Sequence, residues 1–161
     1  MALITSPTQM IPDLNYEYHT ITIDSVGQSS ANTFTCHLQQ PLRNVVQAKL
    51  LAARINTTAA TKHCYLSIDE LDSNFSDRAS NVLTGQSDIS IVRGSFASLV
   101  SEAGTAINFK DEYSISTQYI NPIRSIDRFT VAIRNQDGAT ITNGTGDNFL
   151  VLRFVCRKPN L

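Results

Sequence analysis

Three histidines are the side chains in this sequence best suited to metal binding or to acid–base chemistry. His19, His37 and His63 fall on three different predicted strands. A metal-binding β-sandwich usually places two histidines one residue apart with a carboxylate a few positions further on, and none of the three has such a neighbour. No glycine-rich loop opens a helix that could cradle a phosphate. The sequence therefore predicts no metal ion and no cofactor.

Two pairs of adjacent carboxylates could in principle form an acid–base dyad. They are Asp69 with Glu70, and Asp111 with Glu112. Neighbouring residues on a strand point to opposite faces, so neither pair brings its two carboxylates together. Charges at strand ends that keep sheet edges soluble are the simpler interpretation.

The cysteines pose the remaining chemical question, because two of them have a histidine next to them. Cys36 precedes His37, and Cys64 follows His63. Alternation places each histidine on the face opposite its cysteine, which argues against a thiolate–imidazole pair. Cys156 makes the number of cysteines odd, and all three lie on apolar strand faces, as reduced core residues do. We predict that the protein is not an enzyme and that it folds in a reducing compartment.

The elements that carry these residues read as strands throughout. Short segments with apolar residues at every second position are separated by turns rich in Gly, Pro, Asn and Asp, which is typical of a sandwich or barrel. We expect eight strands in an all-β, antiparallel jelly-roll sandwich. The expected strands cover residues 17–24, 33–39, 45–56, 63–71, 89–96, 113–120, 126–134 and 149–157.

Three parts of this assignment are less direct. Residues 45–56 are rich in Val, Leu and Ala and fit a helix as well as a strand, and the surrounding strands favour a strand. Residues 72–88 are polar and predict a long connecting loop, and residues 98–104 fit a turn or one helical turn. Pro41 and Pro122 are expected to separate strands.

The last predicted strand suggests an interface, since it is apolar on both faces. One face carries Phe149, Val151 and Val155, interrupted by Arg153 and Arg157, and the alternate positions are apolar too. An antiparallel strand of a solitary sandwich should have one polar face. We therefore predict that these five residues contact another subunit; a loop of the same chain that covers them is the alternative.

Length and charge set the remaining limits. The chain of 161 residues suits one domain, and we expect a single jelly-roll domain over residues 16–161 preceded by an extended arm over residues 1–15. Pro7 and Pro12 lie in this arm. The formal net charge of −1 argues against direct nucleic-acid binding. No long apolar run predicts membrane insertion, and no signal peptide is apparent.

The order of these segments resembles the single jelly-roll capsid proteins, pentons and minor capsid proteins, of icosahedral double-stranded DNA viruses such as large algal viruses, virophages and polinton-like viruses. The resemblance is carried by three segments, with residues 72–104 matching poorly: the strand that ends at Asp24-Ser25, the stretch 34–51 around Gln40-Pro41-Leu42, and the stretch 121–131 that leads into Asp137-Gly138.

This resemblance implies a structural protein of the virion capsid that is folded in the host cytoplasm. It implies a homo-oligomer, with a pentamer as the state expected of a penton, and other capsid proteins as partners. It also implies that the arm with Pro7 and Pro12 contacts a neighbouring subunit.

Two other classes of function compete with this one. A ligand- or receptor-binding sandwich, lectin-like or a virion spike head, would use loops such as 74–86 and 143–148, although the chain has no Trp to stack on sugars. A cupin-like enzyme would need the metal-binding pattern that the histidines lack.

Overall fold

A computed structural model describes residues 15–72, 94–100, 105–111, 116–141 and 146–159, and all regular structure in these ranges is β-strand. The expectation of an all-β, antiparallel protein is confirmed. Within the described ranges there is no helix long and apolar enough to cross a membrane. The strands are β1 (Tyr16–Asp24), β2 (Thr33–Asn56), β3 (His63–Ile68), β4 (Ala97–Val100), β5 (Ala106–Lys110), β6 (Thr117–Asn135) and β7 (Phe149–Arg157).

The described residues thus form seven strands and not the predicted eight. The segments expected at 33–39 and 45–56 join into the single 24-residue strand β2, and β6 likewise runs through residues 117–135. Pro41 and Pro122, which were expected to separate strands, lie inside β2 and β6. Each is tolerated there because it falls where the β2–β6 ladder is interrupted. Pro41 lies in the break between His37 and Leu42, and Pro122 lies between the paired residues Gln118 and Ile123. A proline at such a break removes no ladder hydrogen bond.

The region between β3 and β6 also differs from the prediction. Of the strand expected at 89–96, only residues 94–96 lie in the described ranges, and they are not in a strand. β4 covers Ala97–Val100, where a turn or one helical turn was expected over residues 98–104. Residues 73–93 lie outside the described ranges, as does most of the predicted 72–88 loop. β5 was not predicted, although Ile107 and Phe109 alternate as strand residues should. The ambiguous segment 45–56 is a strand, as favoured.

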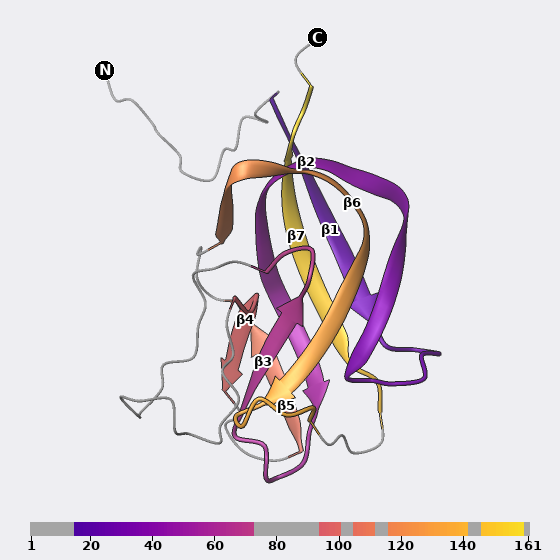
Figure 1. Ribbon diagram of the computed structural model, residues 1–161, viewed down its shortest axis with the longest axis vertical. Helices are drawn as coiled ribbons and strands as arrows, with labels where there is room; N and C mark the ends of the chain where they lie inside the picture. Colours follow the sequence, from indigo (N-terminus) through magenta and orange to yellow (C-terminus); the bar gives the residue numbers. More distant parts are fainter. Residues whose placement is uncertain (1–14, 73–93, 101–104, 112–115, 142–145, 160–161) are drawn as a thin grey trace, which may run out of the picture.

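The seven strands form one sheet that curls back on itself. The order is β1-β7-β2-β6-β3-β4, and β5 pairs with the far end of β2. Figure 1 shows the reason for the curl: β2 and β6 both arch over the same end of the molecule, so each strand contributes to two sides of it. Phe129 of β6 and Phe154 of β7 stack with ring centroids 5.4 Å apart, although β2 separates their strands in the sheet. The curled sheet therefore encloses a core.

The core is built from the alternate, inward positions of the strands. In β7 these are Leu150, Leu152, Phe154 and Cys156, and all four are buried. Opposite them lie buried residues of β6, among them Phe129 and Val131. Burying such side chains stabilises a fold by roughly 1.5–3 kcal/mol each before chain entropy is subtracted. The period-2 pattern read from the sequence is therefore the pattern that forms the core.

A buried polar cluster closes the end of the molecule opposite the arches. Asn148 has no solvent exposure, and its side chain accepts a hydrogen bond from the Asn56 amide at 2.8 Å and donates one to the Ala31 carbonyl at 2.7 Å. Its backbone amide donates to Ser25 Oγ at 3.0 Å. One residue, through its side chain and its backbone amide, thus ties the end of β1, the turn before β2, the end of β2 and the start of β7 together.

Candidate assembly surface

The outward side of β7 forms the middle of a broad sheet face. β7 lies between β1 and the second half of β2, and its register with both strands places the outward residues side by side. Tyr18 lies opposite Val155 on one side, and Gln47 lies opposite Val155 on the other. We call this surface the β7 outer face. It consists of Phe149, Val151, Arg153, Val155 and Arg157 with the outward residues of β1 and β2 that flank them, chiefly Tyr16, Tyr18, Gln47, Lys49 and Arg54.

The outward residues of this face are more exposed than the inward ones, as the alternation predicts, but their exposure differs from residue to residue. Phe149 is 40% exposed and Tyr18 is 49% exposed, whereas Val151, Arg153 and Val155 are partly buried by their neighbours. The partners of β7 therefore shield the middle of the strand and leave a continuous mixed surface of aromatic, aliphatic and basic groups. Such a composition, with aromatic and Arg side chains together, is enriched at protein interfaces.

The positive charges of the face are held in place by neighbouring groups. The guanidinium carbon of Arg153 lies 4.9 Å from the centroid of the Tyr18 ring, a cation–π contact between β7 and β1. Lys49, which is opposite Arg153 across the β2–β7 ladder, forms an ion pair with Asp111. Arg153 is thus directed along the surface and away from Lys49. The two like charges, which a strand pair brings close, are each compensated.

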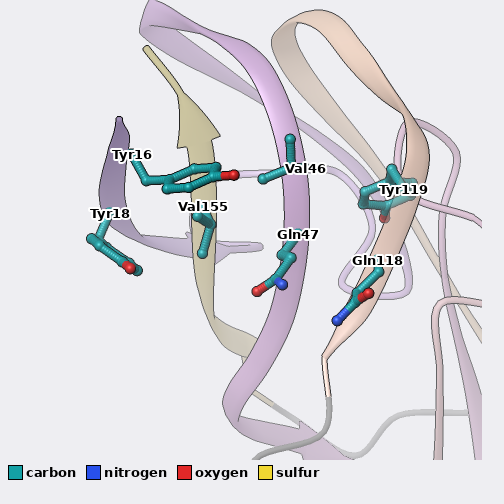
Figure 2. Close-up of a pocket in the computed structure, with 7 residues that line it drawn as sticks. All are labelled: Tyr16, Tyr18, Val46, Gln47, Gln118, Tyr119 and Val155. Carbon is teal, nitrogen blue, oxygen red and sulfur yellow. The ribbon is translucent and has the colours of Figure 1, made fainter. Parts of the chain in front are cut away.

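A hollow of about 390 Å³ lies at one end of this face. Figure 2 shows the residues that line it: Tyr16, Tyr18, Val46, Gln47, Gln118, Tyr119 and Val155. The ring of Tyr16 reaches across β7 toward Val46. The hollow therefore combines four strands, because the first residues of β6 join the face beside β2.

A bulge in β2 explains why Val46 reaches the surface. Between Val45 and Gln47 the partner on β7 moves by one residue only, from Cys156 to Val155, so Val46 is the extra residue of that ladder. The register with β6 shifts at the same point. Asn44, two residues earlier, has a φ of 53°, a left-handed conformation that asparagine tolerates better than most residues. A bulge of this kind redirects a side chain that would otherwise follow the alternation. Val45 remains fully buried while Val46 lines the hollow.

Ile120 extends the apolar character of this region. It follows Gln118 by two residues on β6, on the same face by alternation, and its side chain is 90% exposed. Tyr119, between them, lines the hollow and donates a hydrogen bond from its hydroxyl to the Leu71 carbonyl at 2.8 Å. Burial, with the nearby charge of Asp72, raises the pKa of Tyr119. Tyr119 is therefore a neutral anchor, and Ile120 is left in solvent.

The structure brings the five predicted residues of β7 onto one face, while Pro7 and Pro12 lie outside the described residues. Sequence reasoning missed the contribution of β6, namely Gln118 and Ile120, and the bulged residue Val46. The doublet Val45-Val46 was a usable signal, because two adjacent apolar residues cannot both face inward on a regular strand.

Two of the histidines and Glu70 make polar contacts within the fold. His63 forms a hydrogen bond with Ser98 Oγ at 2.7 Å, and His19 lies 3.4 Å from a Glu17 oxygen. Glu70 accepts hydrogen bonds from both the amide and the hydroxyl of Thr130, at 2.8 and 2.9 Å. In the described ranges, no three His, Cys, Asp or Glu side chains group together as metal ligands would.

The cysteines are free thiols inside or beside the core. Cys64 and Cys156 are buried and Cys36 is partly buried. Burial raises the pKa of all three thiols, that of Cys64 to about 12. Cys36 donates to the Asp24 carbonyl at 3.2 Å, while His37 is exposed opposite Arg128. The two side chains thus diverge as the alternation predicted, and neither thiol next to a histidine is activated as a nucleophile.

Comparison with known proteins identifies no relative: no family model matches the sequence, and no curated protein matches it either. Function has to be argued from the fold and from the β7 outer face.

Proposed function

We propose that this protein is a structural subunit of a viral capsid, a penton or minor capsid protein, that self-associates and packs against neighbouring capsid proteins through the β7 outer face. It acts by occupying a place in a lattice and not by catalysis, and its fold is a jelly roll. Two lines of reasoning support the proposal, one from the order of the strands and one from the uncovered surface.

The pairing of the strands supports the jelly-roll assignment. A jelly roll is a folded antiparallel ribbon in which the first strand pairs with the eighth, the second with the seventh, the third with the sixth and the fourth with the fifth. If residues 33–43 and 45–56 of β2 are counted as two strands, the seven become eight. The ladders then pair β1 with β7, the first half of β2 with β6, the second half with β5, and β3 with β4. These pairings follow the jelly-roll order and support the assignment.

The observation that carries the functional part is the apolar content of the β7 outer face. β7 is an internal strand, flanked on both sides, so its outward residues form the centre of a surface and not its rim. Phe149 and Tyr18 of this face are 40% and 49% exposed, and Ile120 of β6, beside it, is 90% exposed. Exposed apolar groups gathered on one face favour a protein–protein contact. The resemblance to capsid proteins supplies the kind of partner.

The remaining parts of the proposal follow from this role. The partners are other copies of the chain, as a pentamer in the penton form, and other capsid proteins. Three free thiols fit a protein folded in the reducing host cytoplasm before it joins the virion. Neither nucleic acid nor membrane is a direct partner in this proposal.

Native mass spectrometry of the purified chain over a concentration series tests the proposal. We expect oligomers, with a pentamer as the sign of a penton, and we expect Val151→Asp and Val155→Asp to shift the population to monomer. Ala132→Asp is the matched control, because Ala132 is also a partly buried, outward residue of an internal strand, β6, on the other side of the molecule. A wild-type chain that remains monomeric at every concentration and forms no complex with a capsid protein would contradict the proposal. Unfolding of both β7 variants would assign this face to the core.

The hollow favours a second candidate function. Its lining of three tyrosines and two glutamines could hold a small polar ligand such as a sugar, which corresponds to a lectin-like or receptor-binding module. Binding to a glycan array by the monomer, abolished by Gln47→Ala together with Tyr18→Ala, would favour this function over assembly.

A further inference from the structure

β1 presents a long, unprotected edge. It is the first strand in the sheet order, so one side pairs with β7 and, within the described ranges, no strand pairs with the other. All nine residues of β1 pair with β7 in a register without a shift. The strand contains no Pro, no Lys and no bulge, which are the common devices that keep an edge from pairing with another chain. A regular edge of this length can accept another strand.

Two hydrogen bonds establish which backbone groups face the open side. The Lys158 amide donates to the Asn15 carbonyl at 2.8 Å, and the Ser25 amide donates to the Asn148 carbonyl at 3.1 Å. Both pairs lie in the unshifted register of β1 with β7, so odd-numbered residues of β1 exchange hydrogen bonds with β7. The amides and carbonyls of even-numbered residues therefore point to the open side.

The row of backbone groups without a partner strand in the described ranges ends before Asp24, the last residue of β1. The Asp24 carbonyl, which points to the open side, accepts a hydrogen bond from Cys36 Sγ at 3.2 Å. As far as the described residues go, the groups that remain open belong to Tyr16, Tyr18, Thr20 and Thr22. The midpoint of this span is His19.

We propose that this edge pairs with β1 of a second copy, antiparallel and related by a two-fold axis at His19. The proposal rests on the self-association proposed above and adds a second, separate contact. A two-fold axis at the midpoint is the arrangement that pairs every open group of one copy with an open group of the other. It places Tyr16 opposite Thr22 of the second copy, and Tyr18 opposite Thr20 of the second copy.

The side chains suit this self-pairing. On the outward side every pair is an aromatic residue opposite a β-branched one, a favourable cross-strand combination. On the other side Glu17 lies opposite Ile21 of the second copy, so no two carboxylates meet. The paired strands join the two β7 outer faces into one surface, with the tyrosines of both copies at its centre. A second copy is therefore a better occupant than an unrelated strand, because the edge is complementary to itself.

Disulfide trapping tests the register directly. In His19→Cys the two cysteines form a non-hydrogen-bonded pair with Cα atoms about 4.5 Å apart, within the range that a disulfide bridges. Glu17→Cys is the matched control, since it lies on the same strand and side but about 14 Å from its counterpart. We expect a covalent dimer on mild oxidation of His19→Cys at the concentrations where oligomers form, and at least tenfold less from Glu17→Cys and from the parent chain. Equal yields from the two variants, or none from His19→Cys, would overturn the proposal.

Thr20→Pro provides an independent test without a cysteine. The Thr20 amide points to the open side, so proline removes no hydrogen bond within the chain and blocks the incoming strand. We expect loss of the two-fold contact in Thr20→Pro and its retention in Thr20→Val. A Thr20→Pro chain that is folded and still cross-links through His19→Cys would refute the pairing.

These results separate the two proposals. Oligomers that depend on Val151 but never cross-link at residue 19 refute the β1 pairing and leave the capsid role standing. Cross-linked dimers that persist unchanged in Val151→Asp, with no larger species, support the β1 pairing and remove the β7 outer face as the assembly surface.

Discussion

Replacing Asn148 with alanine should be one of the most destabilising single changes at the end of the molecule where the buried polar cluster lies. Its fully buried side chain accepts from the Asn56 amide at 2.8 Å and donates to the Ala31 carbonyl at 2.7 Å. Alanine leaves both backbone groups without these partners. A buried backbone group that loses its hydrogen bond costs about 1–3 kcal/mol.

The expected magnitude follows from the exposure of the two groups. Asn56 and Ala31 are themselves only partly buried, so water can replace part of what is lost. We expect a loss of about 2–4 kcal/mol in the free energy of unfolding, a large share of the roughly 5–15 kcal/mol of a typical domain. The Asn148 amide keeps its bond to Ser25 Oγ, so the chain should still fold.

Urea unfolding followed by circular dichroism measures this loss. The midpoint should fall with little change in the slope m. Asn108→Ala is the control, because Asn108 is an exposed asparagine on the outward side of β5, and it should change stability by less than about 0.5 kcal/mol. A loss below about 1 kcal/mol in Asn148→Ala, similar to the control, would refute the view that this side chain holds the loops together.

Two further predictions concern backbone strain and thiol ionisation. Gly146→Ala should destabilise by about 1–3 kcal/mol in the same urea assay, because φ is +144° and the new Cβ would lie 2.9 Å from Asn56 Nδ2, which is held by the Asp147 carbonyl. Gly27→Ala, with φ +74° and no atom within 4 Å of the new Cβ, should cost less, and equal costs would contradict the steric argument. The pKa of the Cys64 thiol is 9.0, its ordinary value, in the unfolded chain and about 12 in the folded protein. The contribution of this thiol to the free energy of unfolding is therefore complete below pH 9 and is lost as pH rises toward 12. By pH 11 the loss should reach roughly 3 kcal/mol, and Cys64→Val should show a correspondingly flatter decline in stability between pH 9 and 11; identical slopes would contradict the assigned burial.

Strand content was predictable from the sequence, and the continuity of the strands was not. β1, β3 and β7 appear within a few residues of their expected bounds, because period-2 alternation reports burial directly. Pro41 and Pro122 were misleading, since a proline ends a strand only where its missing amide is needed by the ladder. Both fall at interruptions of the β2–β6 pairing, and a register shift is a property of two strands together. A single segment of sequence cannot reveal it.

The candidate surface was predictable to the same extent. The outward residues of β7 follow from alternation within one strand, which is why Val151, Arg153 and Val155 were identified together. The hollow beside them requires four strands and the bulge at Val46, so its lining depends on pairings between residues more than 100 positions apart, such as Tyr18 with Val155. Local pattern can assign a residue to a face but cannot say which other strands complete that face.

The bend of β2 links the core to the proposed surface. At residues 45–47 the strand begins to pair with β7 and bulges, while its partner on β6 jumps from Ile123 to Gln118. Val45 is fully buried at this point while Val46 lines the hollow. The same bulge therefore closes the curled sheet over its core and shapes the end of the β7 outer face. A change that straightened β2 would open the core before it altered the surface, so in this fold the geometry of the assembly surface is set by the packing of the core.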